Sequence, residues 1–389
     1  MVGFLLPVIY LAFISLGLPD PLLGAAWPVM HTEFGVPLSY AGIISMTIAL
    51  GTIVSSILSD RMTRRFGAGK VTAVSVAMTA LALFGFSISH SFGLLILWAV
   101  PYGLGAGGVD AALNNYVAIH YASRHMSWLH CMWGVGTAIG PYFMSYAIGN
   151  AKGWNMGYRY ISILQVILTV ILFISLPLWK SNKPSAESVE KDDTRQSRST
   201  FDILKMPGAK EILTAFFCYC ALEQTAMLWG SSFLLEKTGI DSQTAARLAS
   251  MFCIGITVGR GVNGFLTIKF KDKTLIRMGE VLILAGVGAM LFPFGRLFSI
   301  AGLILVGLGC APVYPCIIHS TPELFGEENS QAMIGIQMAF AYIGILVMPP
   351  LFGVLANGIS VKLLPVYLFI ILFVMFAMYE KVLRIHKKV

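Results

Sequence analysis

Four ionisable residues stand inside long apolar stretches of the sequence. Three are acids: Asp20 in "LGLPDPLLGAAWP", Asp110 in "GVDAALNN" and Glu223 in "ALEQTAMLWG". The fourth is Arg260. Insertion scales put the cost of one such charge at the centre of a membrane helix at about 2.5–3.5 kcal/mol. Facing lipid, the four together would cost roughly 10 kcal/mol. We therefore expect them to face one another or a water-filled cavity.

Asp20 lies between Pro19 and Pro21. Proline lacks an N–H donor and disfavours regular helix, so we expect the helix to bend or open here. Opened backbone is tolerated in a membrane only where it lines a cavity. Burial in such a place favours the neutral acid, and water or a nearby cation restores its charge. A proton-coupled carrier needs an acid of this kind, although a static hydrogen-bond acceptor remains the alternative.

A carboxylate and two amides follow one another along a later apolar stretch. Asn114 lies four residues after Asp110, on the same face of a helix, and Asn115 is adjacent. Carboxylate and carboxamide together offer the acceptors and donors that sugar hydroxyls need. The alternative for the two asparagines is a structural one, because amides also hold membrane helices together.

Arg260 is a permanent cation and needs a partner. We expect it to pair with Glu223 or Asp20; contact with an anionic substrate is the alternative. His130 and Trp133 lie three residues apart and share a helix face. The histidine can donate to a hydroxyl or relay a proton, and the indole can pack against the C–H face of a sugar. A structural role for His130 is the alternative.

Gln337 and Tyr342 are further candidates for substrate contact, in a stretch near the end of the chain. Their amide and hydroxyl can bond to a polar solute. A structural role is the alternative for both.

The elements that must position these side chains are membrane helices. The 389 residues are 57% hydrophobic and 12% charged, whereas a soluble protein carries roughly 25% charged residues. A helix needs about 20 apolar residues to cross a bilayer. We therefore predict an all-α membrane protein with twelve transmembrane helices, at approximately 4–30, 38–59, 69–89, 92–118, 127–149, 157–179, 210–235, 243–268, 275–293, 297–319, 331–356 and 363–383.

The loops indicate orientation and domain organisation. Twenty Lys and Arg residues lie in loops on one side of the predicted spans and six on the other. The positive-inside rule then places both termini in the cytoplasm, so the net charge of +8 anchors the protein and does not indicate nucleic-acid binding. The first apolar segment is predicted to be a retained span. We expect a six-helix bundle at 1–180, a polar cytoplasmic linker at 181–209 and a second six-helix bundle at 210–389.

Short glycine patterns recur between the two halves. "YGLGAGGVDAALNN" aligns with "VGLGCAPVYPCIIH", which pairs Gly103 with Gly307 and Gly105 with Gly309. This weak repeat favours two related six-helix units. The six cysteines all lie in predicted spans, where we expect apolar packing rather than disulfides. The sequence shows no metal-ligand spacing, phosphate loop or nucleotide fingerprint, so we expect no metal, no cofactor and no enzymatic activity.

The turn after the second span resembles the signature of the major facilitator superfamily. Asp60, Arg61, Arg64 and Arg65 occupy its acidic and basic positions, while Ser56 and Thr63 replace its two glycines. With twelve spans and a long central loop, this resemblance covers the whole chain. It implies two six-helix bundles, latched on the cytoplasmic side by this turn.

Within that superfamily, three stretches resemble the fucose/galactose/glucose:proton symporter family. They are "LPDPLLGAAWP", "GVDAALNN" and "LHCMWGVGTAIGP". The resemblance implies alternating access, with Asp20 and Asp110 as proton and sugar sites. It also implies that spans one, four, seven and ten line the cavity, so that Glu223, Gln224 and Trp229 face the substrate and Glu223 takes part in proton coupling.

The leading hypothesis is a secondary active transporter that couples uptake of a small hydrophilic solute, with a sugar as the expected class, to protons. We expect a monomer in the bacterial cytoplasmic membrane, with substrate, protons and lipid as partners. The alternatives are a proton-driven exporter of drugs or lipids with the same fold, and a membrane sensor that binds a ligand without transporting it.

Overall fold

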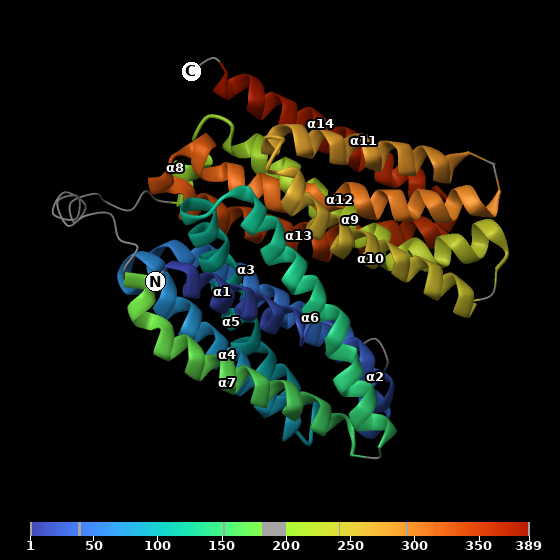
Figure 1. Ribbon diagram of the computed structural model, residues 1–389. Coiled ribbons are helices and arrows are strands. Elements are labelled where there is room, and N and C mark those ends of the chain that lie inside the picture. The colour runs from blue at the N-terminus through green and yellow to red at the C-terminus, as the bar shows by residue number, and fades with distance from the viewer. Residues whose placement is uncertain are drawn as a thin grey trace. The chain divides into compact units, whose positions relative to one another are not determined.

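A computed structural model describes residues 2–37, 40–150, 152–180, 200–240, 242–292 and 295–387. Within these ranges the chain is helical and contains no strand. The helices (Figure 1) are α1 Val2–Gly17, α2 Leu22–Glu33, α3 Ala41–Phe66, α4 Ala68–Ser87, α5 Phe92–His120, α6 Ser123–Gly149, α7 Trp154–Lys180, α8 Thr200–Leu204, α9 Ala209–Thr238, α10 Ser242–Leu266, α11 Asp272–Leu291, α12 Arg296–Phe325, α13 Glu327–Gly358, η3 Val361–Leu363 and α14 Leu364–His386. Most of the predicted linker, 181–199, lies outside the described residues.

The predicted all-α membrane fold is confirmed. Among the described residues, ten helical segments are long and apolar enough to cross a membrane, and α1 with α2 counts as one of them, Leu5–Trp27. The apolar part of α10 is shorter, Met251–Leu266. With α6, which is also long, these helices correspond to the twelve predicted spans.

The first span is broken where its two prolines predict. Helix α1 ends at Gly17 and α2 begins at Leu22 (Figure 1). Pro19 and Pro21 both lie in the intervening turn, which is closed by a hydrogen bond from the Leu22 N–H to the Pro19 carbonyl at 3.0 Å. Asp20 is the residue between them, and its side chain is exposed.

The chain divides into two compact units. Unit 1 comprises Met1–Tyr116 and Met132–Phe201, and unit 2 comprises Val117–Cys131 and Asp202–Val389. The segment Val117–Cys131, which contains the end of α5 and the beginning of α6, therefore belongs to unit 2.

In each unit, two helices cross closely at a glycine. In unit 1, a Cβ at Gly103 of α5 would collide with the Ile48 carbonyl of α3. In unit 2, a Cβ at Gly307 of α12 would lie 2.5 Å from the Phe252 carbonyl of α10. Glycine lets backbones approach this closely in membrane bundles. The predicted pairing of Gly103 with Gly307 thus has an equivalent structural role in each unit.

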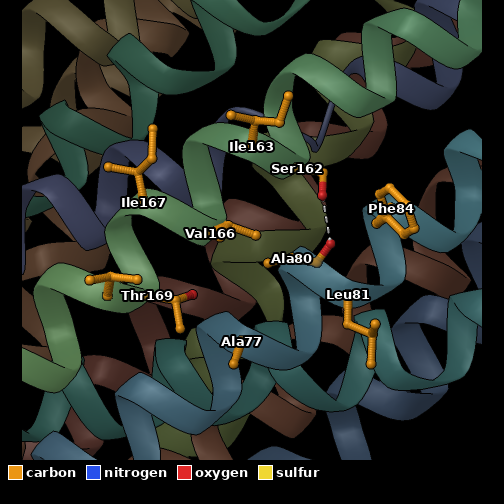
Figure 2. A pocket seen from close by; sticks show the side chains of 10 residues that line it. Ala77, Ala80, Leu81, Phe84, Ser162, Ile163, Val166, Ile167 and Thr169 are labelled. Carbon is orange, nitrogen blue, oxygen red and sulfur yellow. Dashed lines mark hydrogen bonds between the residues drawn. The ribbon is translucent and has the colours of Figure 1, made fainter.

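A groove of about 460 Å³ runs between α4 and α7 of unit 1 (Figure 2). Leu81, Phe84 and Ile167 are among its exposed apolar lining residues. Its two hydroxyls already donate to backbone carbonyls: Ser162 to Ala80 at 2.9 Å and Thr169 to Gln165 at 2.7 Å. The groove suits contact with lipid chains and offers little to a hydrophilic solute.

Candidate functional site

In unit 1, the Asp20 carboxylate accepts hydrogen bonds from two neutral donors. The indole Nε1 of Trp133, on α6, donates to Oδ2 at 2.9 Å. The hydroxyl of Tyr102, on α5, donates to Oδ1 at 3.4 Å. Neutral donors stabilise a carboxylate less than a cation does, so this arrangement holds Asp20 in place without fixing its charge.

A close approach of α1 to α6 places Trp133 beside this turn. A Cβ at Gly17, the last residue of α1, would collide with the Trp133 carbonyl. From the other side, a Cβ at Gly136 would collide with the Ile14 carbonyl, and one at Gly140 with the Leu18 carbonyl. These glycines let α6 lie against the end of α1, and the indole can then reach Asp20.

Asp110 and Asn114 form a buried pair on α5. The Asn114 amide Nδ2 donates to Asp110 Oδ1 at 2.8 Å and to the Asp110 carbonyl at 2.9 Å. Asp110 is 6% exposed and Asn114 is fully buried; Asn115 is also buried. Unit 1 thus contains two of the predicted acids, Asp20 and Asp110, and the amide of Asn114.

In unit 2, Glu223 has a cation as its partner. Arg260 Nη2, on α10, lies 3.4 Å from Glu223 Oε2. The Tyr219 hydroxyl, one turn earlier on α9, donates to the same oxygen and also contacts the Cys310 carbonyl at 3.0 Å. The Arg260 side chain is 4% exposed and that of Glu223 is 13% exposed. Glu223 is one of the two acids that the sequence predicted as partners of Arg260.

An aromatic residue connects this ion pair with His130. The Arg260 guanidinium lies 5.9 Å from the ring centre of Tyr314, on α12. The buried His130 packs edge-on against the same ring, with the ring centres 4.4 Å apart. Glu223, Arg260, Tyr314 and His130 thus form one cluster within unit 2.

Other predicted residues of unit 2 have different surroundings. Trp229 Nε1 donates to the Pro349 carbonyl at 3.0 Å. Gln337 is fully buried and accepts a hydrogen bond from Thr321 at 3.1 Å. Each of these side chains forms a hydrogen bond with another helix of unit 2. Gln224 and Tyr342 are half-buried.

Three tyrosines in these clusters, Tyr102, Tyr219 and Tyr314, were not predicted. Tyr219 carries a local signal, because it precedes Glu223 by four residues and so shares its helix face. Tyr102 lies 82 residues from Asp20, and Tyr314 is 54 residues beyond Arg260 in the sequence, so helix periodicity gives no signal for either contact.

The signature turn keeps its expected charges in a defined arrangement. Asp60 is buried near the end of α3, and Arg64 Nε donates to its Oδ1 at 2.9 Å. Arg61 and Arg65 are exposed. Gly67 ends α3 with φ of 82°, a left-handed conformation that favours glycine.

Metal sites and disulfides would draw on the His, Cys, Asp and Glu side chains of the described ranges. No group of three or more His, Cys, Asp or Glu side chains there could hold a metal ion. All six cysteines are free thiols.

Comparisons with known proteins find relatives that align with most of this chain. "Bypass of stop codon protein 6" of Saccharomyces cerevisiae is 21% identical, over 97% of this chain and 82% of that protein. "Glucose transporter GlcP" of Staphylococcus epidermidis is 23% identical, over 89% of this chain and 86% of that protein. Among solved structures, that of FucP, the E. coli fucose:proton symporter, matches with a TM-score of 0.76 and 15% identity, over 96% of this chain and 98% of that one.

The family model described as Major Facilitator Superfamily matches residues 9–318 and, again, 212–388. Together the two matches span nearly all the described helices. The resemblance drawn from the signature turn is thereby confirmed. Proteins of this superfamily are transporters rather than enzymes. The chain belongs to the major facilitator superfamily and is a multi-pass membrane transporter.

Proposed function

We propose that this transporter couples uptake of a small hydrophilic solute, a sugar, to the movement of protons by alternating access. The proposal rests on the surroundings of the Asp20 carboxylate. Its carboxylate lies exposed in the break between α1 and α2, where Trp133 and Tyr102 hold it through neutral donors. An acid held in this way can gain and lose a proton without losing its place.

The second acid of unit 1 supports proton coupling. Asp110 is buried in the same unit as Asp20 and accepts a hydrogen bond from the neutral amide of Asn114. We assign proton coupling to Asp20 and Asp110. Glu223 is paired with Arg260, so we give it the lesser part in coupling.

The solute class follows from the donors and acceptors beside these acids. Asp110 and Asn114 present a carboxylate and an amide, which match the hydroxyls of a sugar. Trp133 offers an aromatic plane next to Asp20. Proteins named as a glucose transporter and as a fucose:proton symporter are among those that this chain is similar to.

The membrane setting is part of the proposal. The excess of Lys and Arg in alternate loops favours cytoplasmic termini in a bacterial cytoplasmic membrane. The bundles 1–180 and 210–389 would move against each other as a monomer, with the Asp60 turn as a cytoplasmic latch.

Transport by purified protein in proteoliposomes tests this proposal. An imposed gradient of one pH unit supports about tenfold accumulation for each coupled proton, because one unit is worth about 1.36 kcal/mol. Asp20→Asn keeps the side chain's shape and removes its titration. We expect this variant to exchange labelled sugar across the membrane and to lose accumulation against a gradient.

Glu236→Gln is the control, since Glu236 is an exposed acid that accepts a hydrogen bond from Ser360 and lies 4.0 Å from the exposed Lys362. It should accumulate solute as the parent does. Undiminished accumulation by Asp20→Asn would overturn the coupling role. Proton efflux on adding drugs, with no response to sugars, would favour the exporter; ligand binding without flux would favour the sensor.

A further inference from the structure

A second cluster of titratable groups lies in unit 2, away from Glu223 and Arg260. His319, near the end of α12, has its ring Nδ1 2.6 Å from Oδ2 of Asp272, the first residue of α11. Its Nε2 lies 3.2 Å from the Tyr121 carbonyl, in the turn between α5 and α6. Ser123, the first residue of α6, donates its hydroxyl to Asp272 Oδ1.

Both ring nitrogens of His319 therefore face acceptors. A neutral imidazole has one N–H and can satisfy only one of them, whereas the doubly protonated ring donates to both. The Asp272 carboxylate beside it accepts a hydrogen bond from Ser123. It also lies in the first turn of α11, where the helix dipole favours an anion. The geometry is that of a charged histidine bridging two segments.

Titratable groups of α6, α11, α12 and α14 lie around this bridge. Glu323, on α12, lines the same small pocket as Asp272. Lys271, Lys273 and Tyr379 also line this pocket of about 100 Å³. Cys316, one turn before His319, contacts Asp272, and the exposed Arg124 follows Ser123 on α6. His319 is half-buried, with 22% of its side chain exposed, so protons can reach it.

The segment Val117–Cys131 is otherwise joined to α10 by neutral hydrogen bonds. Asn263 donates to the Ser127 hydroxyl at 2.8 Å, and Trp128 Nε1 donates to the Gly261 carbonyl at 3.2 Å. The Cys131 thiol lies 3.5 Å from the Thr257 carbonyl. Charge-assisted hydrogen bonds are roughly twice as strong as neutral ones. The His319 bridge is the contact of this segment that gains charge assistance when the ring is protonated. We call the surface on which Val117–Cys131 meets α10, α11 and α12 the seam.

We infer that His319 is a further proton-binding site, which holds the segment Val117–Cys131 on α11 and α12 while it is charged and releases that segment when it loses a proton. The contact is complete at low pH and weakens as the pH rises through the titration of the ring. Its use in the transport cycle rests on the proposed proton coupling, because a proton delivered to the cytoplasmic side would then leave as the seam opens.

Two measurements on purified protein test this inference, and neither needs solute or a proton gradient. The first is the ¹⁵N spectrum of histidine-labelled protein, in which His319→Gln identifies the His319 signals. We expect both ring nitrogens to carry protons at low pH, and one of them to lose its proton as the pH rises. A ring that stays neutral throughout would overturn the inference.

The second measurement is labelling of Cys131 with N-ethylmaleimide, followed by peptide mass spectrometry. Cys131 is half-buried in the seam, and the exposed Cys253 on α10 serves as the reference thiol. Relative to Cys253, labelling of Cys131 should rise severalfold as His319 deprotonates. Asp272→Asn, which retains the histidine, should show the raised rate already at low pH.

Labelling that follows pH equally at both thiols would contradict the release of the segment. Ser123→Ala serves as the milder variant, since it removes one neutral donor and should shift the labelling profile less than Asp272→Asn. Failure of sugar transport leaves both measurements interpretable, so the two proposals fail independently.

Discussion

The acids of span one and span seven differ in how each is held. Asp20 lies exposed in a helix break, and Trp133 and Tyr102 supply neutral hydrogen bonds. Glu223 lies within the unbroken helix α9 and has Arg260 as a buried partner. The first arrangement leaves the charge of the acid free to change. The second gives the acid a permanent cation as its partner.

The largest expected effect comes from breaking the ion pair of unit 2. Arg260→Met leaves a carboxylate in a buried site without its cation, and removing one partner of a buried pair costs about 3–5 kcal/mol. We expect a marked drop in the midpoint of thermal unfolding of the purified protein.

The double variant Arg260→Met with Glu223→Gln is the control, because it removes both charges and should recover most of the loss. Asp20→Asn should change the midpoint little. Equal losses in Arg260→Met and Asp20→Asn would show that the two acids are held alike.

A smaller effect is expected where α1 meets α6. Gly17→Ala places a methyl group against the Trp133 carbonyl, and overpacking of this kind costs about 1–3 kcal/mol. The variant should unfold at lower temperature and transport less, since Trp133 is displaced from Asp20.

Gly24→Ala is the matched control on α2, where an added Cβ meets nothing within 4 Å. Alanine also has the higher helix propensity there, so this variant should be as stable as the parent or more so. A Gly17→Ala protein as stable as the control would mean that α1 does not press on α6.

The smallest effect is expected from loss of a single donor. Trp133→Phe removes the indole N–H from Asp20 and should cost about 1 kcal/mol of stability, with a weaker apparent affinity for solute in uptake assays. Trp229→Phe loses a comparable hydrogen bond to the Pro349 carbonyl. It should lose similar stability with little change in affinity, and equal losses of affinity would place both indoles at the solute.

Local sequence signals predicted the features that depend on neighbouring residues. The opening of span one follows from Pro19 and Pro21, and the Asp110–Asn114 bond follows from a spacing of four residues. Contacts between distant helices could not be predicted in this way. Helix packing brings Arg260 to Glu223 and Tyr102 to Asp20.

Trp229 illustrates the limit of analogy between the halves. Trp229 follows Glu223 at nearly the spacing at which Trp27 follows Asp20. In the structure its indole N–H bonds to the Pro349 carbonyl and its ring packs against Phe352. The glycine crossings are retained in both units because backbone approach demands them, whereas side chains between them are free to diverge.

The interruption of span one also divides its dipole. Asp20 lies two residues before the first residue of α2, and a helix N-terminus carries roughly half a positive elementary charge. That partial positive charge offsets some of the free-energy cost of an anionic Asp20 within span one. An uninterrupted helix would have no N-terminus at this position. The turn between α1 and α2 thereby places the backbone N–H groups of α2 near Asp20, and their partial positive charge acts as a weak, fixed counter-charge.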